Sequence, residues 1–241
     1  SAYSEIGWRL CWFIFGAINI ILAVLGLLFL KNRSIQDADS EHKNNMKPFN
    51  WNSIYSSGKV WYLGLIYFAF GFSYMIYMTF FVKSLIADGG YSQESASKLF
   101  MVIGWFSLLC GLIWGTVSDI IGRKMALIIV YLIHAISFST FALLPNPTGF
   151  TISAILFGIT AWSIPAIMSA TCGDILGARL APAALGFITL FFGIGQAIAP
   201  SIAGFIADNY GSFLPAFLLA GSISILGALG SSFLRFQIRK L

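Results

Sequence analysis

The sequence contains very little charge. Only 10% of its 241 residues are Asp, Glu, Lys or Arg, whereas soluble domains average about 25%. This shortage excludes both an ordinary soluble domain and a disordered chain. In place of charge, 58% of the residues are hydrophobic, and long apolar runs recur along the chain. Runs of about 20 residues are typical of helices that cross a bilayer, and these runs lack the alternation of membrane β-strands.

Residues for metal binding, catalysis or disulfide formation are also scarce. The three cysteines, Cys11, Cys110 and Cys172, are far apart, and no CxxC pair or Cys/His cluster is present. The sequence therefore predicts no disulfide framework, metal site or cofactor. It contains no HExxH, paired Asp or P-loop motif, so we expect no catalytic residues and no enzyme activity. The net charge of +5 requires no nucleic acid partner, since cytoplasmic loops of membrane proteins collect Lys and Arg.

The apolar runs predict an all-α integral membrane protein with seven transmembrane helices. At 1.5 Å per residue, each run is long enough to cross about 30 Å of hydrocarbon. A polar stretch separates the first run from the other six. We therefore expect a transmembrane helix in 1–30, a cytoplasmic linker in 31–59 and a six-helix bundle in 60–241. The predicted spans are 6–30, 60–83, 95–117, 124–144, 150–170, 183–206 and 213–234.

The distribution of Lys and Arg predicts the orientation of these spans. If 31–59 is cytoplasmic, only Arg9, Lys83 and Lys98 fall on the outer side, and the other basic residues fall on the inner side. The positive-inside rule then places the N-terminus outside and the C-terminus in the cytoplasm. The first span has no basic region or start methionine before it, so it does not resemble a signal peptide. We expect the chain to be a fragment that lacks upstream membrane helices.

A short motif occurs twice at equivalent helix ends. Gly115-Thr-Val-Ser-Asp119-Ile-Ile-Gly122 follows the third span, and Gly204-Phe-Ile-Ala-Asp208-Asn-Tyr-Gly211 follows the sixth. The two copies lie on opposite faces of the membrane, as an inverted repeat of three plus three helices requires. The inner copy continues with Arg123 and Lys124, whereas the outer copy continues without basic residues.

With this motif the chain resembles the major facilitator superfamily. Gly115, Asp119, Gly122, Arg123 and Lys124 match the signature loop of each six-helix half in that family. The resemblance implies that the first span is the family's sixth helix and that the other six form a 3+3 inverted-repeat half bundle. The run from Leu180-Ala-Pro182-Ala-Ala-Leu-Gly186 to Pro200 is similar to a bacterial branch, the YbfB/YjiJ type.

The resemblance implies that the loop from Gly115 to Lys124 is a gate on the cytoplasmic side. The two glycines permit a tight turn and close helix approach, and a carboxylate at Asp119 suits a helix start. Alternatively, the loop only fixes the turn and the topology. A second inner segment, Asp174-Ile-Leu-Gly177-Ala-Arg179, repeats part of the pattern. It is either a second element of the gate or an ordinary polar turn.

One face of the second span carries candidate substrate-binding residues. The spacing of Tyr67, Phe70, Tyr74 and Tyr77 places them on one helix face, with Ser73 nearby. Aromatic rings with hydroxyl groups suit an organic solute, and in the family the corresponding helix lines the central path. The alternative interpretation is core packing or lipid exposure.

Two prolines in later spans indicate further candidates. Pro165 and Pro200 remove the hydrogen bonds to the carbonyls of Ala161 and Gln196. Free backbone groups at mid-depth must face protein or a water-filled cavity. We therefore predict hinges at Pro165 and Pro200 and substrate contacts at the nearby Trp162 and Gln196. A static kink is the alternative.

Other positions in the spans favour packing. His134 is an ionisable group in mid-span, which can mark function, but we expect a neutral, hydrogen-bonded histidine. Small residues form stripes that let helices approach closely. They are Gly104, Ser107, Gly111 and Gly115 in the third span and Gly221, Ser224, Ala228 and Ser231 in the seventh. No Asp or Glu lies deep in a span, so we expect any coupling carboxylate in the absent half.

These observations predict half of a secondary active transporter that moves a small organic solute by alternating access. The resemblance implies a lipid bilayer, most simply a bacterial inner membrane, as its setting. It implies the missing N-terminal six-helix half as a partner, with a coupling proton optional. A seven-helix receptor and a non-transporting membrane scaffold are the alternatives. The inverted repeat and the absence of a mid-span lysine in the last helix disfavour a retinal receptor.

Overall fold

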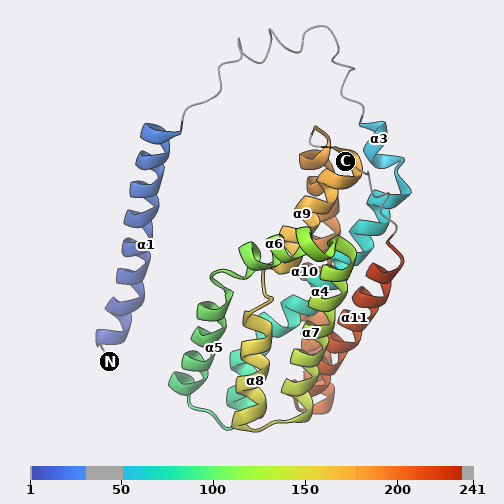
Figure 1. Ribbon diagram of the computed structural model, residues 1–241. Helices are drawn as coiled ribbons and strands as arrows, with labels where there is room; N and C mark the ends of the chain where they lie inside the picture. The colour runs from blue at the N-terminus through green and yellow to red at the C-terminus, as the bar shows by residue number, and fades with distance from the viewer. Residues whose placement is uncertain (1, 31–50, 178, 235–241) are drawn as a thin grey trace, which may run out of the picture. The chain divides into compact units, whose positions relative to one another are not determined.

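The computed structural model describes residues 2–30, 51–177 and 179–234 (Figure 1). The chain forms two compact units, Ser1–Phe49 and Asn50–Leu241. The described part of the first unit is a single helix, α1 (Ala2–Phe29). Most of the predicted linker 31–59 lies outside the described residues. The second unit holds the rest of the helices, and its fold is described by itself.

Helices make up the regular structure of the second unit's described residues. A short α3 (Asn52–Tyr55) precedes α4 (Gly58–Ala87). The other helices are α5 (Gln93–Ser107), α6 (Cys110–Ile121), α7 (Arg123–Leu143), α8 (Pro147–Gly158), α9 (Ser163–Leu176), α10 (Ala181–Tyr210) and α11 (Leu214–Ser232).

The apolar helices confirm the predicted membrane architecture. With α1, six of the described helices or helix pairs are long and apolar enough to cross a membrane, and the bent pair α5 and α6 raises the number to seven. All seven predicted spans coincide with these segments. Two spans differ from expectation, because each consists of two shorter helices (Figure 1). α5 meets α6 at a bend of 42°, and residues 159–162 separate α8 from α9.

Local sequence explains where several helices begin and end. Ser92 caps α5 by accepting a hydrogen bond from the backbone N–H of Ser95, and Asn146 caps α8 before Pro147. Such side chains satisfy amides that lack a partner in the first turn. Asp88 joins two helix ends, because its carboxylate accepts from the Ser84 hydroxyl at 2.7 Å and from the Phe213 N–H at 3.2 Å.

Helix α4 lies at the centre of the bundle. It packs against α10 and α11, and α11 also packs against α7. A Cβ atom at Gly195 would lie 2.7 Å from the carbonyl oxygen of Phe68, so only glycine permits this approach of α10 to α4. Buried aromatic rings from α4, α7, α8 and α11, including Tyr77, Phe138, Phe157 and Phe217, fill the core.

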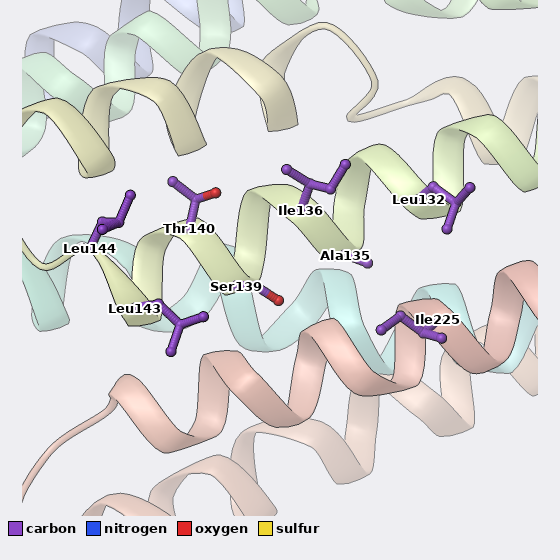
Figure 2. Close-up of a pocket in the computed structure, with 8 residues that line it drawn as sticks. All are labelled: Leu132, Ala135, Ile136, Ser139, Thr140, Leu143, Leu144 and Ile225. Carbon is purple, nitrogen blue, oxygen red and sulfur yellow. The ribbon is translucent and has the colours of Figure 1, made fainter.

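A groove of about 470 Å³ follows the surface between α7 and α11 (Figure 2). Its lining is apolar except for the side chains of Ser139 and Thr140. Small residues on α11 permit the packing beside it, since a Cβ at Gly221 would lie 2.8 Å from the Ser139 hydroxyl oxygen. None of the predicted substrate residues lines this groove.

Candidate functional site

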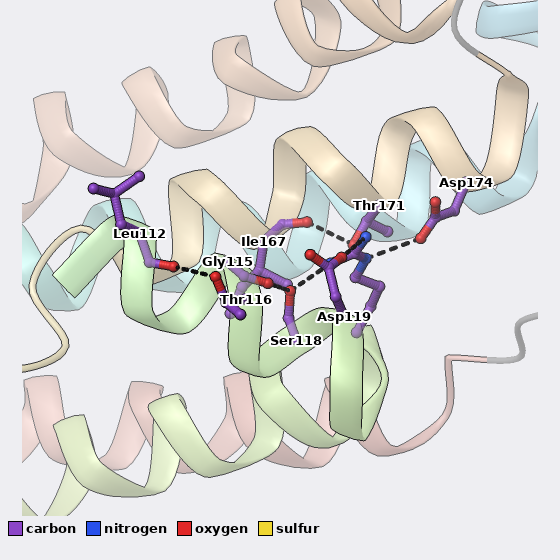
Figure 3. Close-up of polar contacts among 9 residues, drawn as sticks. Leu112, Gly115, Thr116, Ser118, Asp119, Ile167, Thr171 and Asp174 are labelled. Carbon is purple, nitrogen blue, oxygen red and sulfur yellow. Dashed lines mark hydrogen bonds and ion pairs between the residues drawn. The ribbon is translucent and has the colours of Figure 1, made fainter. Parts of the chain in front are cut away.

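A cluster of charged side chains joins α6, α7 and α9 at the end of the bundle that we expect to be cytoplasmic (Figure 3). The guanidinium of Arg123 lies 2.5 Å from a carboxylate oxygen of Asp119 and donates to Asp174 at 2.9 Å. It also donates to the Ser118 hydroxyl. The side chain of Arg123 is 16% exposed, whereas those of Asp119 and Asp174 are 62% and 49% exposed. We call Ser118, Asp119, Arg123 and Asp174 the charge cluster.

Gly122 makes this cluster possible. It has φ of 88°, a conformation that L side chains rarely adopt, and it separates the end of α6 from the start of α7. Asp119 therefore lies in the last turn of α6, four residues before Arg123, the first residue of α7. The side chain of Lys124 makes no ion pair within the described residues, where the charge cluster uses Arg123 alone.

The segment from Asp174 to Gly177 has the same geometry. Gly177 follows the last residue of α9 with φ of 78° and ψ of 162°, close to the 88° and 147° of Gly122. Asp174 precedes Gly177 by three residues, as Asp119 precedes Gly122. Asp174 therefore belongs to the same charge cluster as Asp119, and its part in a gate stays a prediction.

The glycines of the repeated motif do not share all predicted roles. A Cβ at Gly115 would meet nothing within 4 Å, so the expected close approach there is absent from the described unit. The outer copy also ends its helix at a glycine, Gly211, which has φ of 68°. Asp208 in that copy has no hydrogen-bond or ion-pair partner among the described residues. Both copies of the motif therefore end a helix at a glycine, but only the inner copy forms ion pairs among the described residues.

The aromatic stripe on α4 lies largely inside the bundle. Phe70, Ser73 and Tyr77 are fully buried, and the Tyr77 hydroxyl lies 2.7 Å from the Ser153 hydroxyl. Tyr67 and Tyr74 keep 4% and 8% of their surface exposed. In this conformation only Tyr67 and Tyr74 keep any surface that a solute could contact.

Trp162 and Gln196 are more accessible than the stripe. Trp162 lies in the turn between α8 and α9, is 44% exposed, and has its ring 5.5 Å from that of Tyr74. Gln196 on α10 is half-buried, and its amide has no hydrogen-bond partner among the described residues. Phe192, one turn before Gln196, stacks on Tyr67 at 4.8 Å. These side chains bring α4, α9 and α10 together near the middle of their spans.

The two predicted hinge prolines lie in different settings. Pro165 is the third residue of α9, directly after the interruption at 159–162. Pro200 lies inside α10, which continues unbroken from Ala181 to Tyr210. A local interruption therefore accompanies only Pro165.

His134 and Ser163 surround the same interruption. Both are fully buried, and neither ring nitrogen of His134 nor the hydroxyl of Ser163 has a hydrogen-bond partner. The His134 ring faces the backbone of Thr160 in the interruption and stacks against Phe70 and Phe138, at 5.8 and 5.6 Å. Within the described residues, no group of His, Cys, Asp and Glu could hold a metal ion.

Comparison with known proteins identifies the family. The sequence model described as "Uncharacterised MFS-type transporter YbfB" matches residues 3–231. The chain belongs to the major facilitator superfamily.

Relatives and a solved structure agree with this assignment to the major facilitator superfamily. The hexuronate transporter of Bacillus subtilis is 24% identical over 92% of this chain and 56% of its own length. The probable sulfoacetate transporter SauU of Cupriavidus necator is 20% identical over 95% of this chain and 58% of its own. The fucose:proton symporter FucP of E. coli superposes with a TM-score of 0.70 at 16% identity, covering 92% of this chain and 53% of FucP. The chain thus spans about half the length of these relatives.

Sequence reasoning missed several residues of this superfamily member's site. Ser118, Cys110 and Trp114 make polar contacts that no motif indicated. Asp174 was visible as a repeat of Asp119, three residues before a glycine. For the other three, no periodicity or spacing distinguishes them from neighbouring apolar positions.

Proposed function

We propose that this chain is the C-terminal half of a secondary active transporter that moves a small organic solute across a membrane by alternating access. The observation that carries the proposal is the charge cluster, in which Arg123 on α7 joins carboxylates on α6 and α9. Such a pairing stabilises one arrangement of helix ends relative to another. An ion pair that forms in only one access state would act as a latch.

The proposed solute site is formed by Trp162, Tyr74 and Tyr67, with Gln196 one helical turn beyond Phe192, which stacks on Tyr67. Aromatic rings and a free amide at mid-depth suit an organic molecule with polar groups. Phe70, Ser73 and Tyr77 would then support this surface from behind. The hinges of the predicted mechanism would be Pro165 at the interrupted turn and Pro200 in α10. Gly115, Gly122 and Lys124 would complete the gate with Asp119 and Arg123.

The proposal includes a second six-helix half and a coupling proton. Alternating access needs a second six-helix half that faces this one, and the relatives are about twice as long as this chain. A coupling proton would bind in that half, because every charged side chain described in α4 to α11 lies near a helix end or in a loop. We expect the protein in a bacterial inner membrane, with the C-terminus cytoplasmic.

Transport into proteoliposomes tests the proposal. The full-length protein is reconstituted and assayed with radiolabelled hexuronates and with sulfoacetate, because two relatives are named as transporters of these solutes. Asp174→Asn removes one ion pair of the cluster, which at this exposure contributes about 1 kcal/mol or less. We therefore expect a change in the transport rate of up to about fivefold.

A matched control uses an exposed ion pair outside the charge cluster. Lys98→Gln breaks the pair with Glu94, at 2.6 Å on the opposite end of the bundle, and should leave transport unchanged. Equal transport rates for Asp174→Asn and the parent protein would contradict the proposed latch. Absence of uptake for every organic anion, sugar and amino acid tried would argue against a transporter and for the scaffold alternative.

A further inference from the structure

We propose that α6 and α9, the helices that lead from mid-membrane to the charge cluster, move as one rigid lever about the two interrupted turns. The proposal goes beyond the proposed function because it names the helices that move. It rests on the proposed function only for the role of this movement in transport. Its central contacts are those that Cys110 and Trp114 make with the turn at 159–162.

Two hydrogen bonds join the interruptions at mid-depth. The thiol of Cys110, the first residue of α6, accepts from the backbone N–H of Trp162 at 3.2 Å. The indole N–H of Trp114, one turn later, donates to the carbonyl of Ile159 at 2.9 Å. The start of α6 is therefore bonded to backbone groups that no helix satisfies. A tilt of α6 would carry the turn with it.

The opposite ends of α6 and α9 are joined as well. Asp174 lies eleven residues after Ser163, which opens α9, or about 17 Å along a helix. There Arg123, which also pairs with Asp119 at the end of α6, donates to Asp174. The two helices also pack against each other. They are thus connected at both ends, as a rigid unit requires.

The other halves of these spans form a separate pair. α5 packs against α8, and a Cβ at Gly158 would lie 2.7 Å from the Cβ of Phe106. Two helix pairs, α5 with α8 and α6 with α9, therefore meet at facing interruptions. The 42° bend between α5 and α6 shows that the axes already differ in direction at this level.

Unmet polar groups lie beside the turn between α8 and α9. His134 on α7 faces the backbone of Thr160 in this turn, and Ser163 is the first residue of α9. Both are fully buried, and no hydrogen bond of good geometry reaches their side-chain nitrogen and oxygen atoms. Pro165 has no N–H for the carbonyl of Ala161. Buried polar groups without partners favour any rearrangement that satisfies them. This turn, and not the continuous α10, is where a second backbone arrangement gains hydrogen bonds.

The chemical reactivity of Cys110 tests the lever in the full-length protein in proteoliposomes. Cys110 is 1% exposed, so N-ethylmaleimide reacts with it only when the interruption opens. Peptide mass spectrometry follows Cys110 separately, with the exposed Cys11 as a reference for reagent delivery. Asp174→Asn at the far end of the lever and Trp114→Phe at its pivot should each raise the Cys110 labelling rate severalfold.

Two matched variants distinguish a lever from general loosening. Lys98→Gln breaks an exposed ion pair on α5, outside the lever. Trp105→Phe alters an indole on α5 that is 67% exposed. Both should label close to the parental rate. If Asp174→Asn stays at the parental rate, or Lys98→Gln rises as much as Asp174→Asn, the lever is overturned.

Arg123→Lys provides a second way to weaken the far end should Asp174→Asn fold poorly. Lysine keeps the charge but lacks the fork that reaches two carboxylates at once. It should also raise labelling of Cys110, and an unchanged rate would overturn the proposal. The assay needs no substrate, so a failure to find transport leaves its outcome interpretable.

Discussion

At the scale of single residues, the aromatic stripe on α4 shows what residue spacing can predict about a helix face and what it cannot. Spacing correctly placed Tyr67, Phe70, Tyr74 and Tyr77 on one side of a helix. It could not distinguish a cavity wall from a core, because aromatic residues suit both in a chain that is 16% aromatic. The structure shows Tyr77 bonded to Ser153 and enclosed by Phe138 and Phe157.

Tyr77→Phe tests which of these roles the residue has. The change removes one hydroxyl, while Ser153 keeps its contact with Ser137 at 3.2 Å. We expect the free energy of unfolding to fall by about 1 kcal/mol and the KM for transport to stay the same. Thermal unfolding in detergent and uptake kinetics measure the two quantities. Tyr74→Phe, at a ring that keeps 8% of its surface exposed, is the comparison, and a raised KM for Tyr77→Phe alone would place the solute deeper.

At the scale of helices, the sequence predicted the spans better than their interruptions. Apolar length alone located every span, because crossing a bilayer imposes that length. The break between α5 and α6 falls at Leu108 and Leu109, and no proline in either helix signals it. The break before α9 has Pro165 nearby. Pro200, with the same local chemistry, lies in an unbroken helix, so tertiary contacts decide the outcome.

The two predicted small-residue stripes differ in whether their glycines make close helix contacts within the described unit. On α11, Gly221 and Gly227 pack closely against α7, where added Cβ atoms would meet Ser139 and Tyr131. On α5 and α6, Gly104 and Gly115 face open space within the described unit. A stripe shows that close approach is permitted, but the sequence does not reveal which partner uses it.

The contact between α4 and α10 gives a prediction at this scale. Gly195→Ala should lower the free energy of unfolding by about 1–3 kcal/mol, because the new methyl group overpacks a filled interface. Gly193→Ala, two residues earlier and with nothing within 4 Å, should be neutral or slightly stabilising, since alanine favours helix over glycine. Thermal unfolding of both variants provides the comparison. Equal losses would mean that α10 packs on α4 through a different face.

At the scale of the whole molecule, the positive-inside rule predicts which ends face the cytoplasm. Cysteines placed at Ser92 and Asn146, in a background without native cysteines, should react with a membrane-impermeant maleimide added to intact cells. Cysteines at Lys124 and Arg179 should react only after the membrane is permeabilised. The reverse pattern would invert the orientation and move the charge cluster to the outside.

The placement of charge in α4 to α11 has an electrical consequence. Moving one elementary charge through the full membrane potential changes the energy by about 2.3 kcal/mol per 100 mV. The described charges of α6 and α9 lie near their ends, in the charge cluster, and their mid-depth contacts are made by neutral groups. A tilt of these helices would therefore displace little charge across the electric field. Any dependence of the transport rate on voltage would then come from the cargo, or from the second half of the transporter that we propose.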